Sequence, residues 1–302
     1  MKKKTKRLIF YIAMVSLPVL QFVIFYIFVN LNSIILAFKS ITKEIGPDGL
    51  LRYNETFIGF ENFNTVLKDL FDGEKVVSDV WKNTFIAYFV GVATMPLSLL
   101  FSYYIFKKFF GASIFKVVLF LPQVVSGLVL IIMYRYFVVD VLPVLFPGIP
   151  DLLDSSSKNA FWTLLVFGIW MGFGSSVMMY LGGMNNISES IMEYAKLDGA
   201  TALKEFIHII FPMVYPTVAT FVVVGMAGIF TNQMRLFDFY GTTAEPYLQT
   251  LGYYMYAGVK RSGQDLTKYP YFATMGIVFT LITVPLTLTT RWVMQKFGPG
   301  VD

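Results

Sequence analysis

Apolar residues along this chain gather into long runs that carry almost no charge. Six windows each hold about 20 mostly apolar residues, the length that a helix needs to cross the hydrocarbon core of a bilayer. They cover residues 8–31, 84–106, 117–139, 161–183, 209–233 and 271–290. The pattern therefore predicts an all-α integral membrane protein with about six transmembrane helices.

Prolines lie inside most of these windows. A membrane helix tolerates proline where neighbouring helices or water satisfy the carbonyl groups that it frees, so we expect bent helices around a cavity. The chain shows no internal repeat and no low-complexity tract, so residues 1–302 are expected to form a single transmembrane domain. The prolines are Pro18, Pro96, Pro122, Pro212, Pro216 and Pro285.

Composition agrees with this prediction. Hydrophobic residues make up 56% of the chain and charged residues only 14%, whereas about a quarter of a soluble domain is charged. A soluble fold of this length would lack the polar side chains to cover its surface. The basic residues 1–7 lead into an apolar run that is too long for a signal peptide and has no cleavage site, so we interpret that run as the first span.

Basic residues near the ends of the spans predict the orientation. They cluster before the first span and in the short turn after the second, which places both segments in the cytoplasm. Both termini and the 185–208 loop are then cytoplasmic, and the long outer connections include residues 32–83. The net charge of +5 is explained in this way, and no basic stripe with interleaved aromatic residues indicates a nucleic-acid partner. The basic residues are Lys2, Lys3, Lys4, Lys6, Arg7, Lys107, Lys108 and Lys116.

Several kinds of chemistry have no support in the sequence. The chain contains no cysteine and one histidine, His208, so we expect no disulfide, metal site or enzymatic activity. No phosphate-binding loop of the form G-x-x-x-x-G-K-[ST] is present, so ATP hydrolysis by this chain is not expected. No Asp or Glu lies inside the six windows, which argues against an ion-coupled carrier. Gly172 and Gly174 are interpreted as a close-packing site.

The loop between the fourth and fifth spans contains signals for two short helices. Ser190, followed three residues later by Glu193, fits a capping box and predicts a helix start. Gly199 is expected to end this helix, and a second helix is expected to begin near Thr201. Two short helices joined at a glycine corner would form a rigid protrusion at the cytoplasmic face of the membrane.

The same loop resembles a motif of a known family. Permease subunits of binding-protein-dependent ABC importers carry E-A-A-x-x-x-G, nine residues and then I-x-L-P. Here Glu193, Ala195, Gly199, Ile209 and Pro212 fall on that spacing, while Tyr194 and Phe211 depart from it. The added Asp198-Gly199-Ala200 is similar to the carbohydrate-importing branch.

The resemblance extends over most of residues 55–297. The segment 57–63, which reads F-I-G-F-E-N-F, and Asn83-Thr84 at the start of the second span resemble the outer part of sugar permeases. Family members often continue after the fifth span into Gly-Gly-Gly-Pro, whereas this chain has F-D-F-Y-G-T-T at 237–243. The outer substrate contacts therefore do not carry over residue by residue.

The resemblance implies a type I ABC importer permease in the cell membrane of a bacterium. In that family the loop docks on an ATPase subunit. The implied partners are a second, distinct permease, two ATPase subunits that bind ATP and Mg, and an extracytoplasmic solute-binding protein. The residues implied in ATPase coupling are Glu193, Tyr194, Ala195, Asp198, Gly199 and Ala200.

A carbohydrate, and specifically an oligosaccharide, is the expected substrate. Spans four and five line the sugar site in the resembling family, and polar residues there would bind a sugar or a hydrated cavity. Helix–helix hydrogen bonding is an open alternative for them. A non-sugar solute also stays open, as does a secondary carrier or channel. The substrate-path candidates are Trp170, Gly172, Phe173, Ser175 with its neighbour Ser176, Thr231, Asn232, Gln233 and Arg235.

Overall fold

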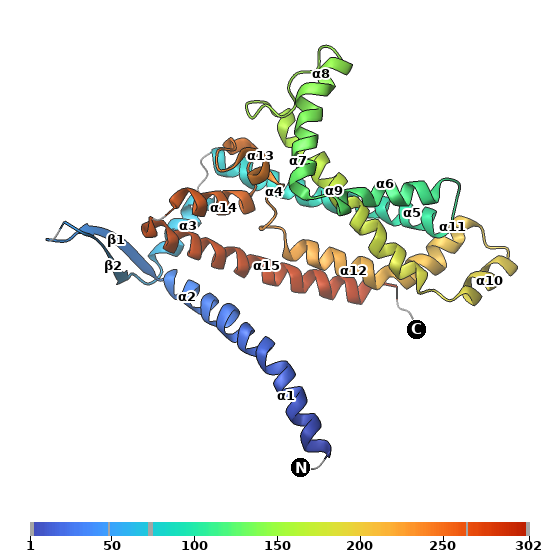
Figure 1. Ribbon diagram of the computed structural model, residues 1–302, viewed down its shortest axis with the longest axis horizontal. Coiled ribbons are helices and arrows are strands. Elements are labelled where there is room, and N and C mark those ends of the chain that lie inside the picture. The colour runs from blue at the N-terminus through green and yellow to red at the C-terminus, as the bar shows by residue number, and fades with distance from the viewer. Residues whose placement is uncertain (1–2, 48, 72–74, 264, 300–302) are drawn as a thin grey trace. The chain divides into compact units, whose positions relative to one another are not determined.

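The computed structural model describes residues 3–47, 49–71, 75–263 and 265–299, so Lys2 of the N-terminal basic block lies outside the described residues. The chain divides into two compact units, of which one comprises Met1–Gly73 with Gly258–Thr280 and the other Glu74–Ala257 with Leu281–Asp302. Figure 1 labels the elements of both units. The prediction of a single transmembrane domain stays a prediction.

Unit one begins with one long apolar helix. Its parts are α1 (Lys3–Phe22), a π-helical stretch (Val23–Phe28) and α2 (Val29–Leu36). None of its most apolar window is buried, so these side chains are available to lipid or to another membrane protein. A hairpin of β1 (Lys39–Ile45) and β2 (Leu51–Phe57) follows, and then α3 (Glu61–Phe71).

Asn62, from the segment that resembles sugar permeases, holds the start of this hairpin in place. Its side-chain amide donates to the carbonyl oxygens of Ala37, at 2.9 Å, and Lys39, at 2.8 Å. Thr274 of the last helix donates to the same Ala37 oxygen at 3.1 Å. The segment 32–83 is therefore structured in its described part, which the sequence left open. Within the described residues the hairpin is the only sheet.

Unit two contains most of the remaining helices. The longest are α4 (Lys75–Ala93), α5 (Met95–Phe106), α6 (Ala112–Val124), α7 (Gly127–Tyr136), α9 (Asn159–Asn185) and α12 (Phe211–Ala227). Shorter ones are α8 (Leu142–Leu145), α10 (Glu189–Leu197), α11 (Ala202–Glu205) and α13 (Leu236–Tyr240). Two helices contribute to both units, namely α14 (Leu251–Ser262) and α15 (Tyr269–Phe297).

Six helical segments of the described chain are long and apolar enough to cross a membrane, which confirms the predicted class of fold. They are Lys4–Leu36, Ser78–Phe106, Gly127–Leu145, Asn159–Asn185, Ala202–Ala227 and Leu266–Phe297.

The third predicted window was wrong in its position. A break between α6 and α7 falls inside 117–139, because Val125 and Ser126 adopt extended backbone angles. Pro122, the β-branched valines before the break and Gly127 after it all weaken helix there. The chain changes direction at this point (Figure 1).

The fifth window was wrong at its end. Helix α12 stops at Ala227, where Gly228 forms the C-cap, so residues 228–235 are not helical. A second correction concerns charge, because Asp79, Asp140 and Glu205 all lie inside the candidate spans of the structure. Asp140 follows the predicted window by one residue, and Glu205 precedes the fifth by four.

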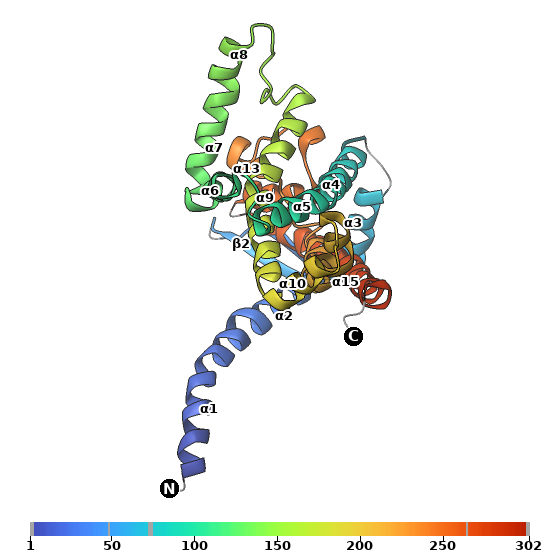
Figure 2. The same ribbon diagram turned by 90° about the vertical axis from the view of Figure 1, so that its right-hand side faces the viewer.

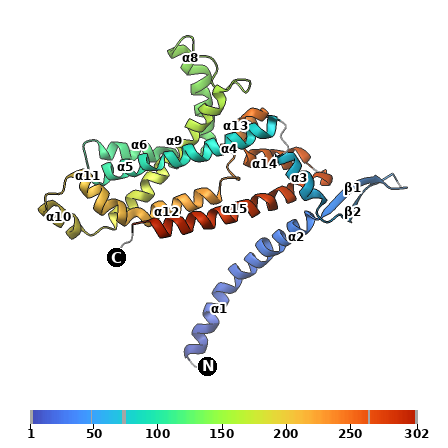
Figure 3. The same ribbon diagram turned by 180° about the vertical axis from the view of Figure 1, so that it is seen from behind.

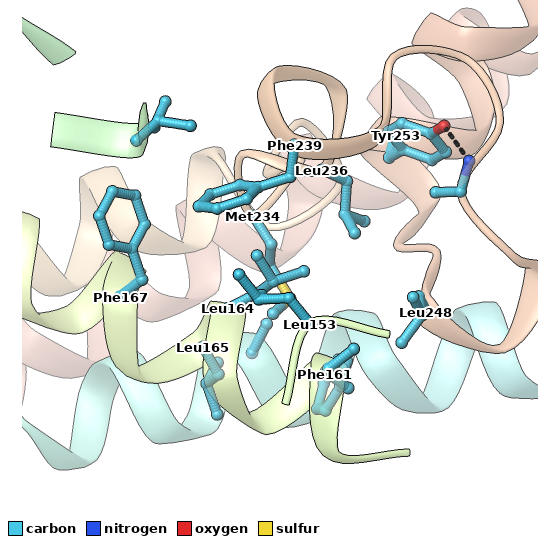
Figure 4. Packing of buried hydrophobic residues seen from close by; sticks show 14 of the residues in the cluster. Leu153, Phe161, Leu164, Leu165, Phe167, Met234, Leu236, Phe239, Leu248 and Tyr253 are labelled. Atoms are coloured by element: carbon cyan, nitrogen blue, oxygen red, sulfur yellow. Dashed lines mark hydrogen bonds between the residues drawn. The ribbon is translucent and has the colours of Figure 1, made fainter. Parts of the chain in front are cut away.

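The core of unit two lies where α9 meets the segments after α12. Phe167 and Leu164 of α9 pack with Leu236 and Phe239 of α13 (Figure 4). Tyr253 of α14 closes this cluster, and its hydroxyl accepts a hydrogen bond from the Ala244 backbone N–H at 3.0 Å. The core therefore fixes the loop segments that follow α12 against a membrane-spanning helix.

Helices α6 and α9 approach so closely that only glycine fits at the contact. A Cβ atom on Gly174 of α9 would overlap the backbone carbonyl of Leu119 in α6. Gly174 therefore has the close-packing role predicted for the glycine pair, because small residues allow membrane helices to approach each other. Gly172 has nothing within 4 Å of such an atom.

We expect Gly174→Ala to destabilise the protein by about 1–3 kcal/mol, because the new methyl group must displace helix backbone. Gly182→Ala is the matched control, since Gly182 lies on the same helix with open space at its Cβ position. Thermal denaturation in detergent, followed by size-exclusion of the soluble fraction, measures both variants. Equal midpoints for the two variants would contradict the close contact.

Candidate functional site

A cavity of about 700 Å³ lies in unit two. Its walls come from α4 and α5, which follow each other in one span, from α9, from the non-helical segment after α12, and from α13 and α14. The lining residues are Ala87, Gly91, Thr94, Met95 and Ser98; Leu164, Leu165, Gly168, Ile169, Gly172, Phe173 and Ser176; Thr231, Asn232, Gln233, Met234, Arg235, Phe237 and Asp238; and Tyr256. The volume is in the range of small-molecule sites.

Most of the predicted substrate-path residues line this cavity. They are Gly172, Phe173, Thr231, Asn232, Gln233 and Arg235, and Ser176 joins them. Trp170 and Ser175 are not among the lining residues. On α9 the lining positions Gly168, Gly172 and Ser176 repeat every four residues and so share a face, and Trp170 lies half a turn away from that face.

The wall formed by the second span was missed by the sequence reasoning. Gly91, Thr94, Met95 and Ser98 all line the cavity. Their spacing of three and four residues puts small and polar groups on one helix face, and this pattern could have identified them. Asp238 and Tyr256 lie outside the predicted spans, so no span-based pattern would have selected them.

The segment after α12 is held by its own side chains. Met234 and Arg235 both have left-handed backbone angles, with φ of 50° and 59°, which is costly for residues with a side chain. The Asn232 side-chain oxygen accepts a hydrogen bond from the Met234 N–H at 2.9 Å. Thr250 donates to the Asn232 carbonyl at 2.6 Å. Asn232 is therefore a structural residue of the cavity wall.

Gln233 and Arg235, which follow Asn232 in the same segment, have side chains that line the cavity. Gln233 is half-buried at the cavity, and its side-chain amide has no hydrogen-bond partner within the part of the chain that the structure describes. Arg235 is paired with Asp238 at 3.4 Å, and these are the two charged residues of the lining. The charges of the cavity wall therefore cancel, and Gln233 offers hydrogen-bonding groups to a ligand.

The end of unit two next to this segment is closed by a network of hydrogen bonds. Asn83 donates to the carbonyl oxygens of Tyr247, at 2.6 Å, and Gln249, at 3.1 Å. The Thr84 hydroxyl accepts from the Leu251 N–H at 2.9 Å. Asn83 and Thr84 thus connect the second span to the loop before α14 and to the first residue of that helix.

Tyr240 belongs to the same end of the unit. Its hydroxyl donates to the Leu153 carbonyl at 2.8 Å, and burial raises the pKa of Tyr240 to about 12. Arg135 of α7 donates to the Phe239 carbonyl at 3.3 Å. Arg135 therefore makes a backbone contact and is not part of the cavity lining.

The loop at residues 185–208 contains the first predicted short helix, α10, whereas the second helix, α11, runs on without a break into the fifth span. The start of α10 also differs from the prediction. Helix α10 begins at Glu189 with Ser188 as its N-cap, and no side chain caps it. The proposed Ser190–Glu193 capping box is therefore wrong. Ser190 lies inside the helix, and its hydroxyl is 3.1 Å from that of Ser188, so the two serines interact with each other.

Gly199 ends the first helix with φ of 68°, a conformation that glycine adopts without strain. Ala200 closes the corner, because its N–H donates to the Ala195 carbonyl at 3.0 Å. Thr201 then caps α11 by accepting from the Lys204 N–H. The predicted corner and second helix are confirmed by this geometry.

The two faces of α10 differ in character. Ala195 is buried with Met192 against the body of unit two, so its contribution is to packing. Tyr194 and Leu197 are 68% and 81% exposed, and Glu193 and Asp198 are exposed beside them. Large apolar groups on a surface mark an interaction site. Figure 2 looks onto the end of unit two that carries this helix.

Similar proteins support the same interpretation of the fold. The chain is 22% identical over 292 residues to the arabinooligosaccharides transport system permease protein AraP of Bacillus subtilis (strain 168), covering 93% of this chain and 88% of that protein. It is 30% identical over 174 residues to the probable ABC transporter permease protein YesP of the same organism, covering 54% and 53%. The chain thus spans about half the length of YesP.

Its fold matches a solved structure over nearly the whole chain. A crystal structure of a bacterial ABC transporter involved in the import of the acidic polysaccharide alginate contains a chain that aligns with a TM-score of 0.73 at 18% identity, covering 98% of each chain. The family model described as binding-protein-dependent transport system inner membrane component matches residues 94–302, which include the cavity segments from Thr94 on and the whole 185–208 loop. The chain is therefore a multi-pass membrane protein that belongs to the family of binding-protein-dependent transport system inner membrane components.

Proposed function

We propose that this chain is one permease subunit of an ATP-binding-cassette importer and that its cavity is the path of a carbohydrate, most simply a neutral oligosaccharide. The cavity itself supports this proposal best. It combines polar groups with aromatic side chains from Phe173, Phe237 and Tyr256. A sugar presents hydroxyl groups and apolar ring faces, and both kinds of lining are complementary to it.

The charges of the lining favour an uncharged substrate. Arg235 and Asp238 neutralise each other, and a polyanion would be better bound by unpaired basic groups. The names of two relatives point to such substrates, because AraP is named for arabinooligosaccharides and AmyD of Thermoanaerobacterium thermosulfurigenes for starch degradation products. Coupling to an ion gradient has less support, since Glu205 is held by Lys107 and Asp140 is not among the residues that line the cavity.

The remaining parts of the transporter are assigned to other chains. Two ATPase subunits bind ATP and Mg, and the exposed face of α10 with Glu193, Tyr194 and Asp198 docks on one of them. A second, distinct permease completes the path, and an extracytoplasmic binding protein delivers the sugar. Both termini of this chain are cytoplasmic in this arrangement. Closure of the ATPases moves the cytoplasmic loop and turns the cavity outward.

The assembly is tested by affinity purification of the tagged protein from its native membrane after mild crosslinking. We expect mass spectrometry to recover an ATPase and a second permease with it. Recovery of this chain alone would contradict the proposal.

Gln233→Ala is expected to raise the substrate concentration at half-maximal uptake about 2- to 12-fold, the value of one lost hydrogen bond. The assay is ATP-dependent uptake of malto- and arabino-oligosaccharides by proteoliposomes that contain the co-purified complex. Gln295→Ala is the control, because Gln295 lies on α15 away from this cavity. An unchanged half-maximal concentration for Gln233→Ala would remove this residue from the substrate path.

Glu193→Ala is expected to lower uptake by about tenfold, a typical size for a coupling effect between sites, because a charge is lost from the docking face. Glu189→Ala removes the same group from the first turn of the same helix and serves as the control. Uptake and the amount of ATPase that co-purifies are measured together. Full uptake by Glu193→Ala would show that this carboxylate has no part in coupling.

A further inference from the structure

An ion pair that the sequence did not predict is buried beside the cytoplasmic loop. Both carboxylate oxygens of Glu205 lie 2.9 Å from the Lys107 ammonium group. The Glu205 side chain is 4% exposed and that of Lys107 19%. The Tyr103 hydroxyl lies 3.0 Å from Glu205 Oε1 and 3.0 Å from the Ala202 carbonyl oxygen. We call Lys107, Glu205 and Tyr103 the Glu205 cluster.

The cluster joins two elements that are far apart in the sequence. Tyr103 lies in the last turn of α5, and Lys107 is its C-cap. Glu205 is the last residue of α11, directly after the corner of the cytoplasmic loop, and the helix continues from it into α12. The cytoplasmic end of the second span is therefore fastened to the junction between the loop and the fifth span.

The two elements would be joined by apolar packing even without the ion pair. The same region already contains a hydrophobic cluster in which Leu99 and Tyr103 of α5 pack with Ile210 and Val214 of the fifth span. Taking an ion pair out of water costs several kcal/mol, and well-packed apolar residues of similar volume are often as stable. The ion pair adds a fixed geometry, because a carboxylate that is bound through both oxygens holds the end of α5 in one orientation relative to α11.

A rigid path leads from the cluster to the cavity. Ser98, which lines the cavity, precedes Lys107 by nine residues on α5, or about 14 Å of helix. Ser102 of the same helix donates to the Val177 carbonyl of α9 at 2.9 Å. Helix α9 supplies Gly172 and Ser176 to the opposite part of the lining. A displacement of the α5 end is thus passed to two walls of the cavity.

We propose that the Glu205 cluster transmits movement of the cytoplasmic loop to the α5–α9 walls of the cavity, in addition to the direct continuation of α11 into α12. Lys107 and Glu205 are positioning residues in this role, because they act on the cavity through the helices that they join. The proposal rests on the proposed function, since an ATPase must move the loop. Without the ion pair, only the apolar contacts of α5 with the fifth span would be left to move the second span with it, and these contacts can slide.

The absence of cysteine from the whole sequence allows a direct test. A single cysteine is placed on the α5 wall by Met95→Cys, or on the segment after α12 by Thr231→Cys, and both positions line the cavity. The rate of labelling by a membrane-impermeant maleimide is measured in the assembled transporter, with and without Mg·ATP and vanadate. With the native cluster, we expect the nucleotide to change the rate at both positions.

Glu205→Gln removes the charge at nearly constant volume. We expect it to reduce the nucleotide response at Met95→Cys at least about fivefold while the response at Thr231→Cys is kept. Lys107→Arg should preserve both responses, and the exchange of Lys107→Glu with Glu205→Lys should restore much of the first. Lys116→Gln, which removes a lysine from an exposed position of the next helix, α6, is the control and should preserve both.

A merely structural role for the cluster would lower the amount of assembled complex and affect both positions equally. Tyr103→Phe, which removes only a hydroxyl group, provides a milder variant if Glu205→Gln fails to assemble, and it should weaken the Met95→Cys response selectively. A full response at Met95→Cys in these variants would overturn the proposal. Absence of any nucleotide response at either position with the native cluster would instead overturn the proposed ATP-driven function.

Discussion

A chain that crosses hydrocarbon must satisfy its backbone N–H and C=O groups within the protein, because no water is present to do so. This constraint explains why non-helical backbone within the spanning region is confined to a few places of the described chain. The stretch after α12 is the main example, where Asn232 and Thr250 replace the missing helical hydrogen bonds. Irregular backbone of this kind is tolerated where it lines a cavity, and this stretch forms one wall of the cavity in unit two.

The two ends of unit two serve different purposes. At one end Asn83 and Thr84 bind the loop before α14, which keeps the cavity segment in place. At the other end the 185–208 loop exposes Tyr194 and Leu197, and Glu205, which follows α10, is paired with Lys107 at the end of α5. In the opposite view of Figure 3, α10 and α11 lie at the far end of α5 and α9 from α13. The spanning helices of unit two are therefore fixed by hydrogen bonds at one end and by an ion pair at the other. This arrangement suits a cavity that opens and closes when the 185–208 loop moves.

Hydrophobic runs were sufficient to predict the membrane fold, since burial in lipid demands about 20 apolar residues per span. They could not locate the break at Val125–Ser126, because apolar composition continues on both sides of it, and they placed the end of the fifth span too late, because Ile229 and Phe230 extend the apolar run beyond Ala227. The family resemblance pointed to the fourth and fifth spans, and six of the residues chosen there, together with Ser176, line the cavity. Trp170 and Ser175 do not line it, and Leu164, Leu165, Gly168, Ile169 and Met234 do so without having been predicted. Thr94 and Ser98 were missed because small polar residues on an apolar helix can either line a cavity or form hydrogen bonds within and between helices. Glu205 was missed because its partner, Lys107, is distant in the sequence and was assigned to orientation alone.

The central claim, that ATP drives a neutral oligosaccharide through the cavity of this chain, is tested most directly by uptake into proteoliposomes that contain the purified complex with its binding protein. The account predicts accumulation of malto- or arabino-oligosaccharides when ATP is enclosed with the ATPase subunits, and none when ATP is omitted. Accumulation driven by a proton or sodium gradient, with this chain alone and no ATPase, would contradict it.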